Sequence, residues 1–159
     1  MHQPVADQVL VVGYGNSLRG DDGAGTYVAN LLLRHGWPNI HVLSTTQLTP
    51  ELAEDIALAR GVIFVDAFKA TEGSAVRIQE ITPEQSSQCD SHMVSPKGLL
   101  QLARDYFGNV PRAWLVMVGG YHFHLSDTLS AAAEENARAS ARVVIELAQQ
   151  ILSNEVQHA

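Results

Sequence analysis

The chain has 159 residues, which suits one ordinary domain and leaves no room for a second. Hydrophobic residues make up 46% of it and charged residues 17%, a composition typical of folded rather than disordered proteins. Ten basic against 17 acidic residues give a net charge of −7, which argues against nucleic acid and anionic membrane surfaces as partners. We therefore expect a single domain over residues 1–159 that binds neither nucleic acid nor membrane.

Cysteine content and hydropathy indicate the compartment. Cys89 is the only cysteine, so the chain has no disulfide framework and no multi-cysteine metal site, as is usual in a reducing environment. No apolar run approaches the roughly 20 residues of a membrane span, and the first residues lack the basic region of a signal peptide. These features predict a cytoplasmic protein.

The first half of the chain alternates short apolar runs with helical patterns. Residues 8–14 are apolar and rich in β-branched side chains without alternation, as in a strand buried on both faces. The same patterns predict, in order, strand 8–14, a helix from Asp22 closed by Gly36, strand 40–44, a helix opened by Thr49-Pro50 and stopped by Gly61, and strand 62–66. The last of these strands ends at Asp66.

The second half adds a solvated strand and two longer helices. Residues 75–81 alternate polar and apolar, and because no helix separates them from strand 62–66 we expect the two to be antiparallel. Helix 95–107 with Pro96 in its first turn, strand 114–118, an irregular loop 119–126 and helix 131–152 follow. The whole pattern predicts an α/β fold: one three-layer domain whose mostly parallel, twisted sheet has about five strands, one of them antiparallel, with helices on both faces.

A glycine-rich turn, residues 13–23, joins the first strand to the first helix. It departs from the dinucleotide-binding fingerprint, because Leu18 stands where the third glycine belongs. Asp21 and Asp22 would also repel a pyrophosphate at the helix N-terminus. One acid is enough to cap a helix, so the second suggests a cation site.

Asp66 strengthens this hypothesis. Ligands of doubly wound sheets bind beyond the carboxyl ends of the strands, where the first and third strands commonly lie side by side, and this would bring Asp22 and Asp66 to one crevice. Taken alone, an aspartate after a strand is more often a turn or cap residue. Two carboxylates need an imidazole to hold a transition metal, and three histidines lie in suitable loops without spacing to choose among them: His92, His122 and His124.

These residues, in this order, resemble the hydrogenase maturation endopeptidases. Members of that family open with a strand and Gly-x-Gly-Asn, matched by Gly13-Tyr14-Gly15-Asn16, followed by an acid pair before glycine, matched by Asp21-Asp22-Gly23. They have an aspartate after the third strand and a histidine in the loop before the next helix, matched by Asp66 and His92. This chain departs from the family within residues 120–126, where two histidines replace the usual Pro and Glu.

The resemblance implies an endopeptidase that removes a C-terminal peptide from the large-subunit precursor of a nickel–iron hydrogenase after nickel insertion. Asp22, Asp66 and His92 would then be both the metal-contacting and the catalytic residues. The precursor would supply the nickel, for which zinc or cadmium would substitute in vitro. Asp21, the nearest acid free of metal, is the candidate general base.

Three alternatives remain open. The first is a metallohydrolase with its own permanently bound zinc, and the second is a nickel-dependent maturation chaperone that docks on the precursor without cutting it. The third is a thiol protease built on Cys89, three residues before His92, although a lone cysteine is more often a small packed hydrophobe.

Overall fold

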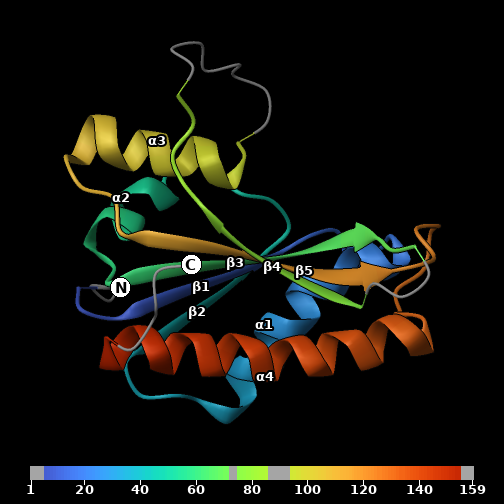
Figure 1. The fold of residues 1–159 in the computed structure, drawn as a ribbon. Helices are drawn as coiled ribbons and strands as arrows, with labels where there is room; N and C mark the ends of the chain where they lie inside the picture. Colours follow the sequence, from blue (N-terminus) through green and yellow to red (C-terminus); the bar gives the residue numbers. More distant parts are fainter. Residues whose placement is uncertain (1–5, 72–74, 86–93, 155–159) are drawn as a thin grey trace.

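The computed structural model describes residues 6–71, 75–85 and 94–154, which form a five-stranded sheet between two layers of helices (Figure 1). The strands lie in the order β2-β1-β3-β5-β4, and their bounds are β1 Val9–Tyr14, β2 Ile40–Thr45, β3 Gly61–Lys69, β4 Val76–Ile81 and β5 Arg112–Gly120. Strands β1, β2, β3 and β5 run parallel to one another, and β4 is antiparallel to β5. The predicted fold class is therefore confirmed.

The helices cover both faces of the sheet, as Figure 1 shows. On one face lie α1, Ala24–His35, and the long α4, Ala131–Ser153, and on the other lie α2, Leu52–Leu58, and α3, Pro96–Phe107. Alternate strand residues feed the two cores: Val65 of β3 packs on the α1 and α4 side, whereas Phe64 packs on the α2 and α3 side. Successive residues of a strand therefore face opposite helical layers.

Strand order creates a switch point at β1. The chain leaves β1 toward β2 on one side and returns to β3 on the other, where Gly13 pairs with Val65. The first and third strands thus lie side by side, as predicted. Such a switch point opens a crevice at the carboxyl ends of the strands.

Two expectations about β3 and β4 need correction. The direction of β4 is as predicted, but β5 lies between β4 and β3, because β5 pairs with β3 along all nine residues of each strand. In addition, β3 does not end at Asp66: its ladder continues to the pair Lys69–Gly120. Asp66 is therefore held by the sheet itself rather than by a turn.

Local signals place the helix ends. Ser95 caps α3 by accepting a 3.0 Å hydrogen bond from the Gly98 amide, and Gly108 ends the helix with a positive φ of 74°. A short 3-10 turn, η1 Gly20–Gly23, precedes α1, so the α-helix itself starts two residues after Asp22. No helix of the described part of the chain is long and apolar enough to cross a membrane.

Candidate functional site

The glycine-rich turn brings α1 close to the ends of β1 and β3. A Cβ atom on Gly25 would collide with the carbonyl oxygens of Tyr14 and Val65, and Gly15 has a φ of 144° and lies against the backbone of Asp22. The glycines therefore permit close backbone contact, with no phosphate needed to explain them. This contact places Asp22 beside the end of β1.

Asp66 lies on the sheet face covered by α2 and α3, half-buried among groups that constrain it. Its Oδ1 accepts a 2.8 Å hydrogen bond from the Ala67 amide, and the Tyr14 hydroxyl donates a second hydrogen bond to the carboxylate. Burial is the main cause that raises the pKa of Asp66 to about 6; the two hydrogen bonds oppose the rise, and the negative charge of Asp22 adds to it. Burial and the same carboxylate also raise the pKa of the Tyr14 hydroxyl, so it remains a donor at neutral pH.

Asp22 is held by the turn opposite. Its Oδ2 accepts a 2.8 Å hydrogen bond from the Asn16 amide, while the Asn16 side chain accepts a 2.9 Å bond from the Leu18 amide. The structure thus brings Asp22 into electrostatic range of Asp66, as the switch-point hypothesis predicted.

The chemistry of this pair suits a cation. The two carboxylates lie close enough to interact electrostatically, and within the described residues neither forms an ion pair to Lys or Arg. Carboxylate oxygens are ligands for divalent metals, and a cation between them would relieve their repulsion. The described residues hold no group of three His, Cys, Asp or Glu able to bind a metal, so a complete site needs a further ligand.

The three candidate histidines differ in what the structure says of them. His92, like Cys89, lies outside the described residues. His122 and His124 are exposed on the loop after β5, with ring centroids 6.0 Å apart, at the same end of the sheet as predicted. Neither joins Asp22 and Asp66 in a three-residue metal group within the described part of the chain.

Asp21 has a structural role, but it binds distant loops instead of capping the first helix as the sequence suggested, and its expected role as general base is wrong. Its carboxylate is fully buried and accepts four hydrogen bonds of 2.7 to 2.9 Å, from the amides of Tyr121, His122 and Ser130 and from the Ser130 hydroxyl. These bonds hold the pKa of Asp21 below its usual range against the opposing effect of burial. A base so enclosed has no access to a substrate proton.

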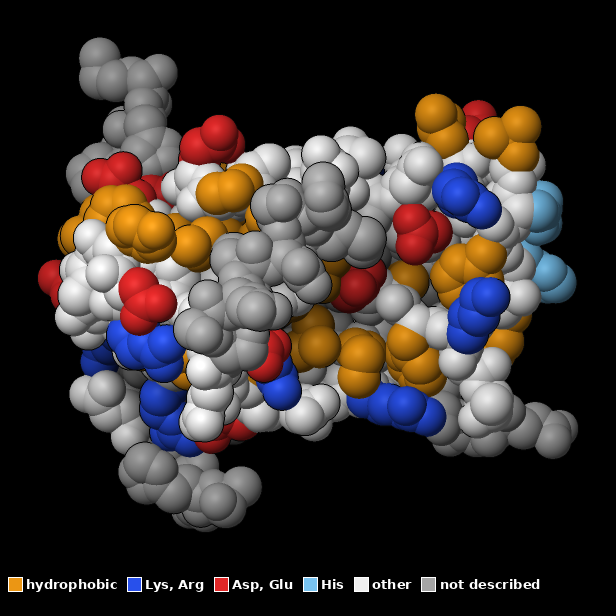
Figure 2. All heavy atoms as spheres, turned by 90° about the horizontal axis from the view of Figure 1, so that it is seen from above, with side chains coloured by type: hydrophobic (Ala, Val, Ile, Leu, Met, Phe, Trp, Pro, Cys, Tyr) orange, Lys and Arg blue, Asp and Glu red, His pale blue; other side chains and the backbone are white. Residues whose placement is uncertain are grey.

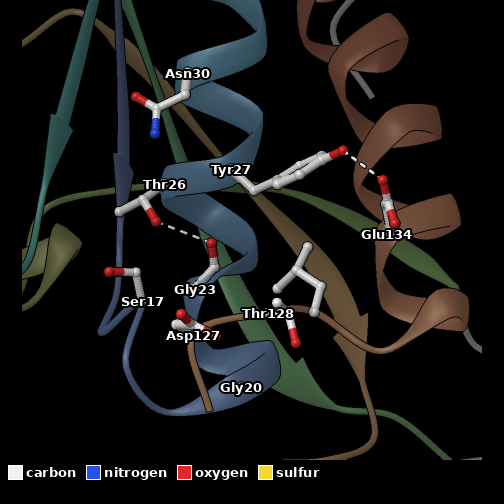
Figure 3. A pocket seen from close by; sticks show the side chains of 10 residues that line it. Ser17, Gly20, Gly23, Thr26, Tyr27, Asn30, Asp127, Thr128 and Glu134 are labelled. Atoms are coloured by element: carbon white, nitrogen blue, oxygen red, sulfur yellow. Dashed lines mark hydrogen bonds between the residues drawn. The ribbon is translucent and has the colours of Figure 1, made fainter.

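A second hollow lies beside the site, on the other face of the sheet. Its volume is about 320 Å³, and it is lined mainly by η1, α1 and the loop before α4 (Figure 3). The Tyr27 hydroxyl donates a 2.8 Å hydrogen bond to Glu134 across it, joining residues 107 positions apart. Neither Asp22 nor Asp66 lines this hollow.

No protein-family model and no curated protein sequence matches the chain. Solved structures do match. The hydrogenase maturating endopeptidase HybD from E. coli is 19% identical over 90% of this chain and 93% of that one, with a TM-score of 0.71. The [NiFe] hydrogenase maturation protease HycI from Thermococcus kodakarensis KOD1 is 21% identical over 89% of this chain and 92% of that one, with a TM-score of 0.69. The hydrogenase 2 maturation peptidase from Thaumarchaeota archaeon SCGC_AB-539-E09 is 26% identical over 89% of this chain and 97% of that one, with a TM-score of 0.66. The likeness to hydrogenase maturation endopeptidases predicted from the sequence is thereby confirmed, and the chain has their fold.

The Tyr14 hydroxyl offers a direct test of the site. In Tyr14→Phe the hydrogen bond that lowers the pKa of Asp66 is lost, so that pKa should rise above about 6. Because a metal binds the ionised carboxylate, the pH at which metal affinity is half lost should rise with it. Isothermal titration with Zn²⁺ at several pH values measures the shift. An unchanged pH profile would show that Tyr14 does not act on Asp66.

Proposed function

We propose that this chain, which has the fold of the hydrogenase maturation endopeptidases, is itself such an endopeptidase. It removes a C-terminal peptide from a nickel-loaded large-subunit precursor of a nickel–iron hydrogenase, in the cytoplasm. The single observation that carries the proposal is the pair of carboxylates at the switch point, Asp22 on the glycine-rich turn and Asp66 in β3. The solved structures supply the class of reaction, which their names state for those proteins.

The proposed metal contacts are Asp22, Asp66 and His92. The nickel belongs to the precursor, which it marks as ready for processing, and zinc or cadmium would take its place in the isolated protein. A bound metal would supply Lewis acidity at the scissile carbonyl. The chain orients the two carboxylates through its own bonds: Asn16 fixes Asp22, and Ala67 with Tyr14 fixes Asp66. Partial burial of Asp66 strengthens the electrostatic interactions of its carboxylate.

Incubation with nickel-loaded precursor tests the activity. Mass spectrometry should show the loss of a C-terminal fragment from the precursor, with the chain itself unchanged. A precursor that binds but keeps its full mass would make the protein a maturation chaperone. Zinc found in protein purified without added metal would instead favour a permanently metallated hydrolase.

Two substitutions separate metal from thiol chemistry. We expect His92→Ala to lower Zn²⁺ affinity by at least about tenfold, as loss of one ligand in three should do, and to stop processing. Cys89→Ser, the matched control in the same segment, should process precursor at close to the normal rate. A Cys89→Ser protein that folds and binds metal but does not cut would make this a cysteine protease. Unchanged affinity in His92→Ala would redirect the search to His122 and His124.

A further inference from the structure

Two leucines stand exposed beside the candidate site. Leu125 is 86% exposed and Leu18 is 60% exposed, in a chain that buries most of its large apolar side chains. They lie in different loops, 107 positions apart, yet the Arg19–Ser126 bridge aligns those loops in parallel, so Leu18 and Leu125 occupy matching positions. The Ser126 amide donates to the Leu18 carbonyl at 3.0 Å. Residues at matching positions of a parallel pair present side chains to the same side, and we call these two the leucine pair.

The loops that carry the leucine pair are firmly braced. Asp21 accepts hydrogen bonds from the Tyr121 and His122 amides, and its own amide donates to the His122 carbonyl at 2.8 Å. Gly20 adopts a φ of 58° against that same carbonyl. A buried carboxylate thus joins the two loops, and binding through them would incur little ordering cost.

The leucine pair is continuous with the candidate site. Asn16 donates its amide to Asp22 and accepts the Leu18 amide on its side chain, so one residue orients both the carboxylate and the leucine. Figure 2 shows hydrophobic and histidine side chains gathered at the end of the molecule toward which β1, β3 and β5 run. A macromolecule whose chain enters the Asp22–Asp66 crevice would meet this surface.

We propose that the leucine pair docks the precursor, through an apolar patch on the precursor next to its C-terminal peptide. This inference rests on the proposed function, because the occupant is the substrate of the neighbouring site. An exposed apolar side chain far from the site has no such neighbour: Tyr106 is 77% exposed, but it lies in the last turn of α3, near the amino ends of the strands. The leucine pair is the better candidate because it lies beside the candidate site, its two side chains are aligned by the Arg19–Ser126 bridge, and its loops are held by Asp21.

Steady-state processing kinetics test the docking role. The double substitution Leu18→Ser with Leu125→Ser should raise KM for nickel-loaded precursor by about tenfold or more, since two apolar side chains lose their burial on binding. It should leave kcat within about twofold and Zn²⁺ affinity unchanged. Tyr106→Ser, the matched control, should change none of these. An unchanged KM, or a fall in kcat alone, would overturn the inference.

A binding assay separates this inference from the proposed function. Precursor affinity is measured by biolayer interferometry in two Asp66→Asn proteins, one with the leucine pair and one with both serines. Weaker binding of the serine protein by about tenfold supports docking, even if the wild-type chain never cuts the precursor. Equal binding of the two, or no binding by either, refutes the docking role. Unfolding of both proteins at the same temperature confirms that the exposed positions leave the fold intact.

Discussion

Asp66→Asn should abolish precursor processing and at the same time make the metal-free protein more stable at neutral pH. The fold raises the pKa of Asp66 from its ordinary 3.8 to about 6, chiefly by burial, so ionising this side chain costs more in the folded than in the unfolded state. A difference of about two pKa units corresponds to about 2 to 3 kcal/mol. Asparagine is neutral, and it can still accept the Ala67 amide while donating to the Tyr14 hydroxyl.

The sign of the pH dependence makes this prediction specific. Between about pH 4 and pH 6 the unfolded chain loses the Asp66 proton before the folded chain does, so wild-type stability should fall as the pH rises through this window. Above pH 6 the full free-energy cost of ionising Asp66 in the folded state lowers stability, and below pH 4 this cost is absent. Urea unfolding at pH 4 and pH 8 should therefore show Asp66→Asn gaining stability only at the higher pH. The exposed loop acid Asp127 provides the control, because Asp127→Asn should change stability by less than about 0.5 kcal/mol at either pH. A destabilised Asp66→Asn at both pH values would mean that Asp66 is a structural residue.

Asp21→Asn should destabilise the fold by about 3 kcal/mol without touching the metal contacts directly. The fully buried carboxylate accepts four hydrogen bonds. In asparagine an NH2 group replaces one carboxylate oxygen, and this donor group would then face N–H or O–H donors. Because Asp21 joins η1, the loop after β5 and the start of α4, its loss should loosen all three.

Urea unfolding at pH 7 measures this effect, again with Asp127→Asn as the control. The folded pKa of Asp21 is lowered, so its carboxylate stabilises the fold above the ordinary value of 3.8, and that contribution is lost as the pH falls below 3.8 through the lowered value. The two proteins should therefore converge in stability under strongly acidic conditions. An Asp21→Asn protein as stable as wild type at pH 7 would contradict the bracing role of this residue.

The sequence alone determined the features that depend on neighbouring residues: the strands, the helix bounds and the position of the acids at one edge of the sheet. Buried apolar runs predicted the parallel strands, and Pro96 in the first turn of the predicted helix 95–107 marked the start of α3. The acid after the third apolar run and the acid pair in the glycine-rich turn pointed to one crevice, because parallel strands bring their carboxyl ends to the same edge. These signals depend on the backbone preferences and the order of nearby residues, which a sequence displays directly.

Only the tertiary structure decided the contacts between distant segments. The alternation of residues 75–81 predicted a strand with one solvated face, but its neighbour in the sheet is β5, which begins more than 30 residues later in the chain. The continuation of β3 past Asp66 likewise depends on the β5 ladder. Asp21 looked like a helix cap or a base, and it became a buried brace because the amides of residues 121, 122 and 130 fold onto it. A carboxylate carries no local sign of partners a hundred residues away, so its burial and its bonds exist only once the chain has folded.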